Sequence, residues 1–126
     1  MREQMFFLAE IGSPESRVGE AIVRAARYRD AGADGVFIPG LSETNAIKAI
    51  ASEVKMPLNV MSVPDLPSAK ELKKLGVRRL TAGTAIAQAV WGRVAELAAG
   101  FLASGESKPM FKNSMTYSKL QNMFLK

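Results

Sequence analysis

The sequence predicts an α/β fold with four parallel strand–helix units, which form either half of an eight-fold barrel or a small open sheet. Short apolar runs begin near residues 5, 35, 57 and 77, and a helical pattern follows each of them. This spacing is typical of parallel βαβ units with right-handed crossovers. The run GVFIP lacks polar alternation, as do strands that helices cover on both faces.

The first unit is expected to consist of a strand over Met5–Ile11 and a helix after it. Ser13 is a suitable helix N-cap, and Pro14 fits the first helical position. Gly32 is a natural stop for this helix. Its predicted apolar face consists of Val18, Ile22, Ala25 and Ala26.

The second and third strands are expected in GVFIPG and PLNVM, over residues 35–40 and 57–61. We expect Ser42 to cap the helix that joins them. The apolar residues of that helix recur at helical spacing and are Ala46, Ile47, Ile50, Ala51 and Val54.

The third unit ends in a short helix, which the capping box formed by Ser68 and Glu71 predicts and which ends at Gly76. The strand VRRLTAG follows, and then a long alanine-rich helix over residues 85–103. A polar linker leads to an amphipathic helix in MTYSKLQNMFLK. We therefore expect a half-barrel domain over residues 1–105, and a linker with a C-terminal helix over residues 106–126.

Composition limits the available chemistry. The 126 residues include no cysteine and no histidine, which excludes thiolate nucleophiles, thiolate metal sites and imidazole bases. The net charge of +5 is spread along helical segments without a basic tail, so no nucleic-acid partner is expected. The apolar stretches are shorter than the roughly 20 residues of a membrane span. The sequence shows no signal peptide, and a cytoplasmic location is expected.

Asn59 is the main candidate for a site residue, because it lies within an otherwise apolar strand. A buried amide without partners costs about 1–3 kcal/mol. Two interpretations remain equally open. Asn59 is either a core residue with satisfied hydrogen bonds, or a hydrogen-bond donor directed into the mouth of a barrel.

Several stretches in order resemble the isocitrate lyase and phosphoenolpyruvate phosphonomutase superfamily. They are EAIVRAARYRDAGADGVFIPGL, PLNV, LPSAKELKKLGVRRLTAGTAIAQAV and MTYSKLQNMF. The resemblance extends from about Glu20 onward and concerns the C-terminal half of the family. The phosphonomutase-like members, often named carboxyvinyl-carboxyphosphonate phosphorylmutases, are the more similar ones.

The resemblance implies a (β/α)8 TIM barrel with an extra C-terminal helical region, in which residues 5–82 provide strands five to eight. Such enzymes make or break C–C or P–C bonds in small 2-oxo or 2-hydroxy carboxylates, with Mg²⁺ stabilising an enolate. The resemblance also implies that Asn59 lies near the carboxylate of the substrate.

Two departures from the family pattern limit what is expected of this chain. The metal-binding acids and the mobile catalytic loop of the family belong to the N-terminal half, so no metal site and no cofactor are expected here. The fifth strand of relatives often ends in an Ala-Arg pair whose Arg binds the substrate carboxylate. This chain has LAEIGS, with Glu10 at the position of that Arg.

Three hypotheses follow. The chain is a truncated or partial lyase or phosphonomutase without a complete active site of its own, or a non-catalytic α/β module that self-associates. A small-ligand binder with an open sheet is a more remote alternative. A homo-oligomer is expected, because Val90, Val94, Leu97 and Phe101 contribute to an apolar stripe on the long helix.

Overall fold

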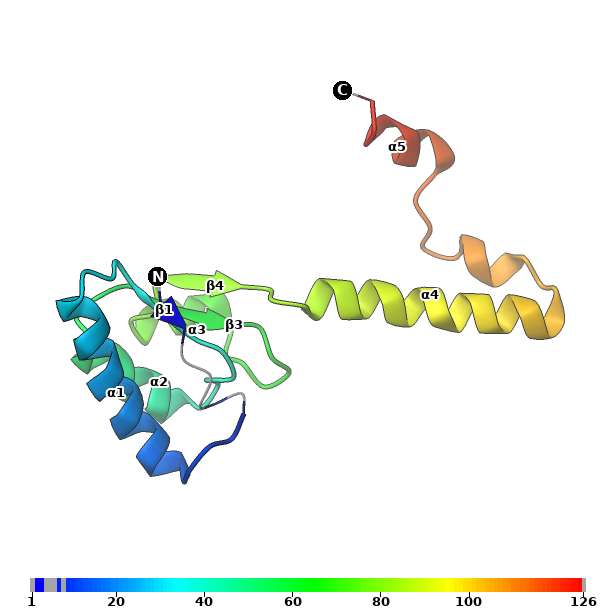
Figure 1. Ribbon diagram of the computed structural model, residues 1–126. Coiled ribbons are helices and arrows are strands. Elements are labelled where there is room, and N and C mark those ends of the chain that lie inside the picture. Colours follow the sequence, from blue (N-terminus) through cyan, green and yellow to red (C-terminus); the bar gives the residue numbers. More distant parts are fainter. Residues whose placement is uncertain (1, 4–6, 8, 126) are drawn as a thin grey trace. The chain divides into compact units, whose positions relative to one another are not determined.

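The computed structural model describes residues 2–3, 7 and 9–125 of the chain (Figure 1). These residues divide into two compact units, Met1–Ala85 and Ile86–Lys126. Among the residues described, no helix has the length and apolar character that a membrane crossing requires.

The first unit contains a sheet of four parallel strands in sequence order. Its strands are β1 (Arg2–Glu3), β2 (Val36–Ile38), β3 (Leu58–Met61) and β4 (Arg79–Thr81). Asn59 lies in register with Phe37 on one side and with Arg79 on the other. The parallel α/β architecture expected from the sequence is confirmed.

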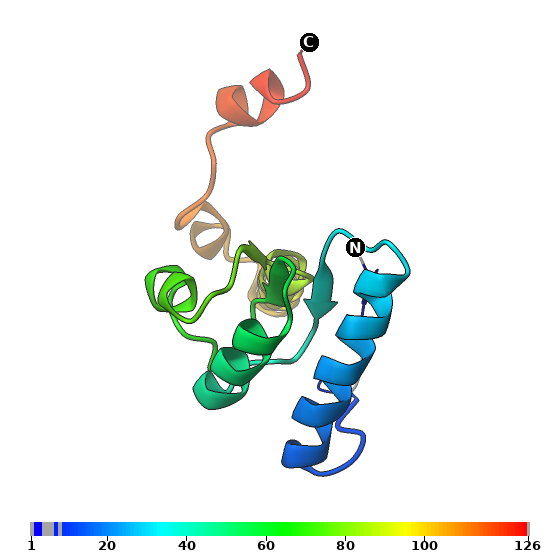
Figure 2. The same cartoon turned by 90° about the vertical axis from the view of Figure 1, so that its left-hand side faces the viewer.

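Three helices cover one face of this sheet, namely α1 (Pro14–Asp30), α2 (Thr44–Glu53) and α3 (Ala69–Lys74) (Figure 2). Alternate strand residues point toward them, since Val36 and Ile38 are buried while Phe37 between them is only half-buried. The fully buried side chains that form the centre of the core are Ala21, Ala25, Val36, Ile38, Leu41, Ile47, Ile50 and Val60.

The first strand does not lie where the apolar pattern placed it. Phe7, Ala9 and Glu10 are in turns, while the paired strand is Arg2–Glu3; residues 5, 6 and 8 of the expected strand lie outside the described residues. Glu10 has a φ of 51° and Gly12 a φ of 79°. An extended strand has negative φ throughout, so the end of the apolar run forms a turn.

Of the predicted N-caps of α1, α2 and α3, the structure confirms those of α1 and α3. The Ser13 side chain accepts from the backbone of Ser16, and Ser68 and Glu71 form the expected capping box. The cap of α2 is Glu43, where Ser42 was expected. A glutamate reaches two backbone amides at once, and this double contact replaces the usual serine cap.

The second unit contains most of the long helix α4 (Ala85–Ser104), a 3₁₀ helix η1 (Lys108–Phe111) and α5 (Tyr117–Asn122). The last helix is shorter than expected, because it is capped by Thr116 and ends at Asn122. None of the α4 residues is buried. The domain boundary expected after residue 105 remains a prediction.

Candidate functional site

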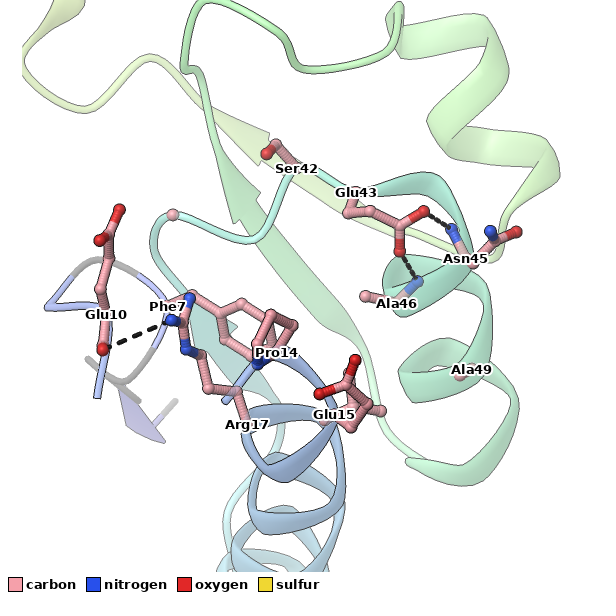
Figure 3. A pocket seen from close by; sticks show the side chains of 12 residues that line it. Phe7, Glu10, Pro14, Glu15, Arg17, Ser42, Glu43, Asn45, Ala46 and Ala49 are labelled. Atoms are coloured by element: carbon pink, nitrogen blue, oxygen red, sulfur yellow. Dashed lines mark hydrogen bonds between the residues drawn. The ribbon is translucent and has the colours of Figure 1, made fainter. Parts of the chain in front are cut away.

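A cavity of about 680 Å³ opens beside the carboxyl end of β2, where the N-termini of α1 and α2 lie close together (Figure 3). In parallel α/β proteins, ligands bind at this edge of the sheet. The cavity combines apolar and charged side chains. The residues that line it are Phe7, Glu10, Pro14, Glu15, Arg17, Val18, Gly40, Ser42, Glu43, Asn45, Ala46 and Ala49.

Arg17 holds the turn that leads into α1. Its Nε donates to the carbonyl oxygen of Gly12 at 3.0 Å, and its Nη2 donates to the carbonyl oxygen of Glu10 at 3.4 Å (Figure 3). These contacts keep Glu10 on the cavity wall despite its positive φ. Much of the donor capacity of Arg17 is therefore directed to the backbone.

Glu43 closes the other side of the cavity. One carboxylate oxygen accepts from the backbone amide of Asn45 at 2.9 Å, and the second accepts from that of Ala46 at 2.5 Å (Figure 3). Charge-assisted contacts of this kind satisfy amides that a helix start leaves without partners. Both oxygens of Glu43 already have partners.

The electrostatic character of the cavity is acidic. Glu10, Glu15 and Glu43 contribute three carboxylates, and Arg17 is the only cation among the described lining residues. Glu15 lies in the first turn of α1, where the helix dipole favours an anion. This arrangement can accept hydrogen bonds, and it repels an anionic ligand.

Asn59 and Glu10 are not brought together. Glu10 lies on the cavity wall, whereas Asn59 is fully buried in β3 and is not among the residues that line the cavity. Among the described residues, neither Nδ2 nor Oδ1 of Asn59 has a hydrogen-bond partner. The role of Asn59 in substrate binding remains a prediction.

Sequence reasoning did not identify Arg17 or Glu43 as parts of the site. Glu43 could have been found, because it follows the Pro39–Gly40 turn at the end of a strand and directly precedes a helical pattern. No sequence pattern pointed to Arg17. Its contacts are with the turn at Glu10 and Gly12, and the apolar run had predicted a strand up to Ile11 instead of that turn.

The described residues offer no obvious place for a divalent cation. No group of three or more acidic side chains with suitable positions for a metal ion occurs within residues 2–3, 7 and 9–125. The Glu43 carboxylate, which faces the cavity, is directed to two amides. Carboxylate oxygens are suitable Mg²⁺ ligands, but the described carboxylates of the cavity, Glu10, Glu15 and Glu43, are not grouped to hold a metal ion.

Comparison with known families identifies the chain. Residues 2–102 match the family model described as phosphoenolpyruvate phosphomutase. The chain belongs to this family. The resemblance inferred from the sequence motifs is thereby confirmed.

Among curated proteins similar to this chain, an uncharacterised protein of Mycobacterium tuberculosis is 37% identical over 100 residues, or 79% of this chain and 37% of that protein. The oxaloacetate decarboxylase of Pseudomonas fluorescens is 37% identical over 67 residues, or 51% of this chain and 23% of the enzyme. The chain thus spans well under half the length of the curated relatives it matches.

Two solved structures have a similar fold over part of their length. A candidate lyase/mutase from Burkholderia cenocepacia superposes with a TM-score of 0.84 and 27% identity, covering 99% of this chain and 44% of that one. A candidate phosphonomutase from the same organism has a TM-score of 0.67 and 29% identity, covering 78% and 41%. This family member therefore has the fold of part of a larger lyase or mutase.

Proposed function

We propose that this chain supplies the C-terminal half of a phosphonomutase-like (β/α)8 TIM barrel and has no complete active site of its own. The reaction class is the cleavage or formation of C–C or P–C bonds in small 2-oxo or 2-hydroxy carboxylates. One observation carries the proposal: nearly the whole chain superposes on 44% of a candidate lyase/mutase.

The sheet supports the half-barrel. Its four strands are parallel and in sequence order, and the helices of the first unit cover one face. In a closed barrel the opposite face points inward, and every strand has two neighbours. Here β1 and β4 are edge strands, which leaves each of them able to pair with a strand of another half.

In this proposal Asn59 is a substrate-binding residue of the completed barrel. Phe37, Asn59 and Arg79 occupy one row of the sheet, on the face opposite the core residues Val36 and Leu58. The amide of Asn59 has both a donor and an acceptor without partners. It therefore suits a group that both donates and accepts, or a carboxylate together with a water molecule.

Glu10 stands where relatives often have an arginine, and its charge repels the carboxylate of a substrate. In the proposed barrel, Glu10 faces an uncharged part of the substrate. Mg²⁺, which full-length family members are expected to use, supplies charge stabilisation for an enolate when bound. Its ligands belong to the other half in this proposal, and Glu10, Glu15 and Glu43 do not hold it.

Reconstitution tests the proposal. The chain is mixed with the remaining part of the Burkholderia lyase/mutase, produced without the 44% that superposes, and the mass is measured by light scattering. We expect a mixed complex with one copy of each part. A chain that remains separate and fully folded in the presence of that fragment contradicts the half-barrel.

A second candidate function is a non-catalytic module that self-associates through α4. The observation that favours it is the exposure of large apolar side chains on that helix, with Trp91 69% exposed and Leu102 85% exposed. Isolated surface apolar residues are common, but a continuous stripe usually marks an interface. The exposed members of this stripe are Ile86, Val90, Trp91, Val94, Phe101 and Leu102.

Replacing Leu97 and Phe101 with Asp tests this association. The two charges are expected to convert the oligomer to a monomer, because carboxylates are not tolerated in an apolar contact. Light scattering at about 10 µM detects an association of roughly −7 kcal/mol. A well-folded monomer of the unsubstituted chain at that concentration rules the candidate out.

A further inference from the structure

A second hollow lies at the opposite edge of the sheet from the acidic cavity. It has a volume of about 250 Å³ and lies between the end of α3 and the beginning of β4. Buried Leu72 and Val77 provide apolar surface, and Leu80 is 43% exposed beside them. Lys73, Arg78 and Arg79 are the charged residues that line it.

The charge of this segment is strongly unbalanced. Between Ala69 and Thr81 there are five cations and one acid, Glu71. Glu71 is directed to the start of α3, where its carboxylate accepts from the backbone and the hydroxyl of Ser68 at 2.9 and 2.6 Å. Its hydrogen bonds are therefore made at the start of the helix, and the segment keeps an excess of positive charge.

The cations of the hollow are not required to complete the helix end. Amides of Leu75, Gly76 and Val77 already donate to the last carbonyls of α3. Lys73 and Arg78 take part in none of the ion pairs of the described residues, which lie on α1 and α4. Arg78 directly precedes β4, and both Arg78 and Leu80 line the hollow.

We propose that this hollow binds a phosphate-sized anion through Lys73 and Arg78. A guanidinium presents a planar fork that matches phosphate oxygens, and an ammonium adds a compact charge. The volume is below the roughly 300–1,000 Å³ of pockets for drug-sized ligands, which suits a phosphoryl group with a small apolar body. This site is separate from the proposed substrate site and goes beyond the function proposed above.

Titration of the 126-residue chain tests the inference. Amide NMR spectra are recorded with increasing inorganic phosphate at low, constant ionic strength, and again with phenyl phosphate. We expect saturable shifts at Lys73, Val77 and Arg78. Tighter binding of phenyl phosphate assigns the site to phosphate esters, and equal binding assigns it to free phosphate.

The matched variants are K73Q/R78Q and K70Q/K74Q, which remove the same charge from the same segment. Lys70 and Lys74 do not line the hollow. We expect K73Q/R78Q to weaken binding about tenfold, since exposed charged contacts are individually modest, and K70Q/K74Q to weaken it much less. If K73Q/R78Q does not fold, R78K, which keeps the charge but loses the fork, is expected to weaken binding severalfold. Shifts that do not saturate, or equal losses in both double variants, overturn the proposal.

Discussion

Asn59 is a buried polar residue within an otherwise apolar core. Its side chain is fully buried, and its two polar atoms have no hydrogen-bond partners among the described residues. Natural structures contain few such groups, and each of them calls for a physical explanation. In the half-barrel account, the explanation is that the hydrogen-bonding partners of Asn59 come from outside this chain.

The stability of an Asn59→Leu variant measures this cost. Leucine has a similar volume and no polar atoms, so we expect the free energy of unfolding of the isolated chain to rise by about 1–3 kcal/mol. Urea denaturation followed by circular dichroism gives the value. Asn59→Asp is the matched control, and it is expected to lower stability because it buries a charge. A loss of stability in Asn59→Leu would show that the amide makes hydrogen bonds in the folded chain.

The two residues identified as site candidates from the sequence differ in how predictable they were. The burial of Asn59 could be predicted, because its neighbours Leu58 and Val60 are apolar. The absence of partners could not, since that depends on which atoms of other segments lie nearby. The turn at Glu10 was hidden by the apolar run around it, and residue type alone does not reveal a positive φ.

At the scale of elements, the caps determine where helices begin. The sequence predicted the starts of α1 and α3 from Ser13 and Ser68, because each serine directly precedes a helical pattern. For α2 it predicted Ser42, whereas the adjacent Glu43 is the cap. Only the geometry of the strand-to-helix turn decides which of them reaches the free amides.

The α2 cap provides a direct comparison of these two residues. Glu43→Ala removes both contacts to the amides of Asn45 and Ala46, and it is expected to lower stability by about 1 kcal/mol. Ser42→Ala, which leaves those contacts in place, is expected to have much less effect. Thermal or urea denaturation checks both variants. If Ser42→Ala lowers stability more than Glu43→Ala, then Ser42 is the cap of α2, as the sequence predicted.

The α3 capping box makes stability depend on pH. Hydrogen bonds from the side chain and then the backbone of Ser68 lower the pKa of Glu71 below its ordinary value. A carboxylate whose pKa is lowered by folding stabilises the protein above its unfolded pKa, and this contribution is lost as the pH falls through the folded pKa.

Glu71→Gln is therefore expected to be less stable than the natural chain at neutral pH. The difference is expected to shrink as the pH falls below the ordinary glutamate range, about 4.3. Urea titrations at a series of pH values measure it, with Glu53→Gln as a control that removes a carboxylate outside any capping box. A difference that stays constant or grows toward acid pH would contradict the role of Glu71.

At the scale of the whole molecule, much of the architecture followed from the sequence. Apolar runs such as GVFIP predicted buried parallel strands, and β2 and β3 lie inside the expected segments. The family was also predicted, from the order of AGADGVFIPG and LGVRRLTAG. The acidic cavity was not, because Glu10, Glu15 and Glu43 come from separate segments that only the fold brings together.

Two features of the molecule are explained if another half completes the proposed barrel. They are the two edge strands of the sheet and the buried amide of Asn59, which has no partners among the described residues. The fraction of relatives covered agrees with this, since the chain matches only 23% of an oxaloacetate decarboxylase.

Turnover by the purified chain is the measurement that tests the central claim most directly. The chain is incubated with Mg²⁺ and oxaloacetate, 2-methylisocitrate or phosphonopyruvate, and product formation is followed with a full-length relative as the positive control. The account predicts no product above the rate without protein, because the chain has no histidine or cysteine and its described acids form no metal site. Robust turnover that a chelator abolishes would contradict it.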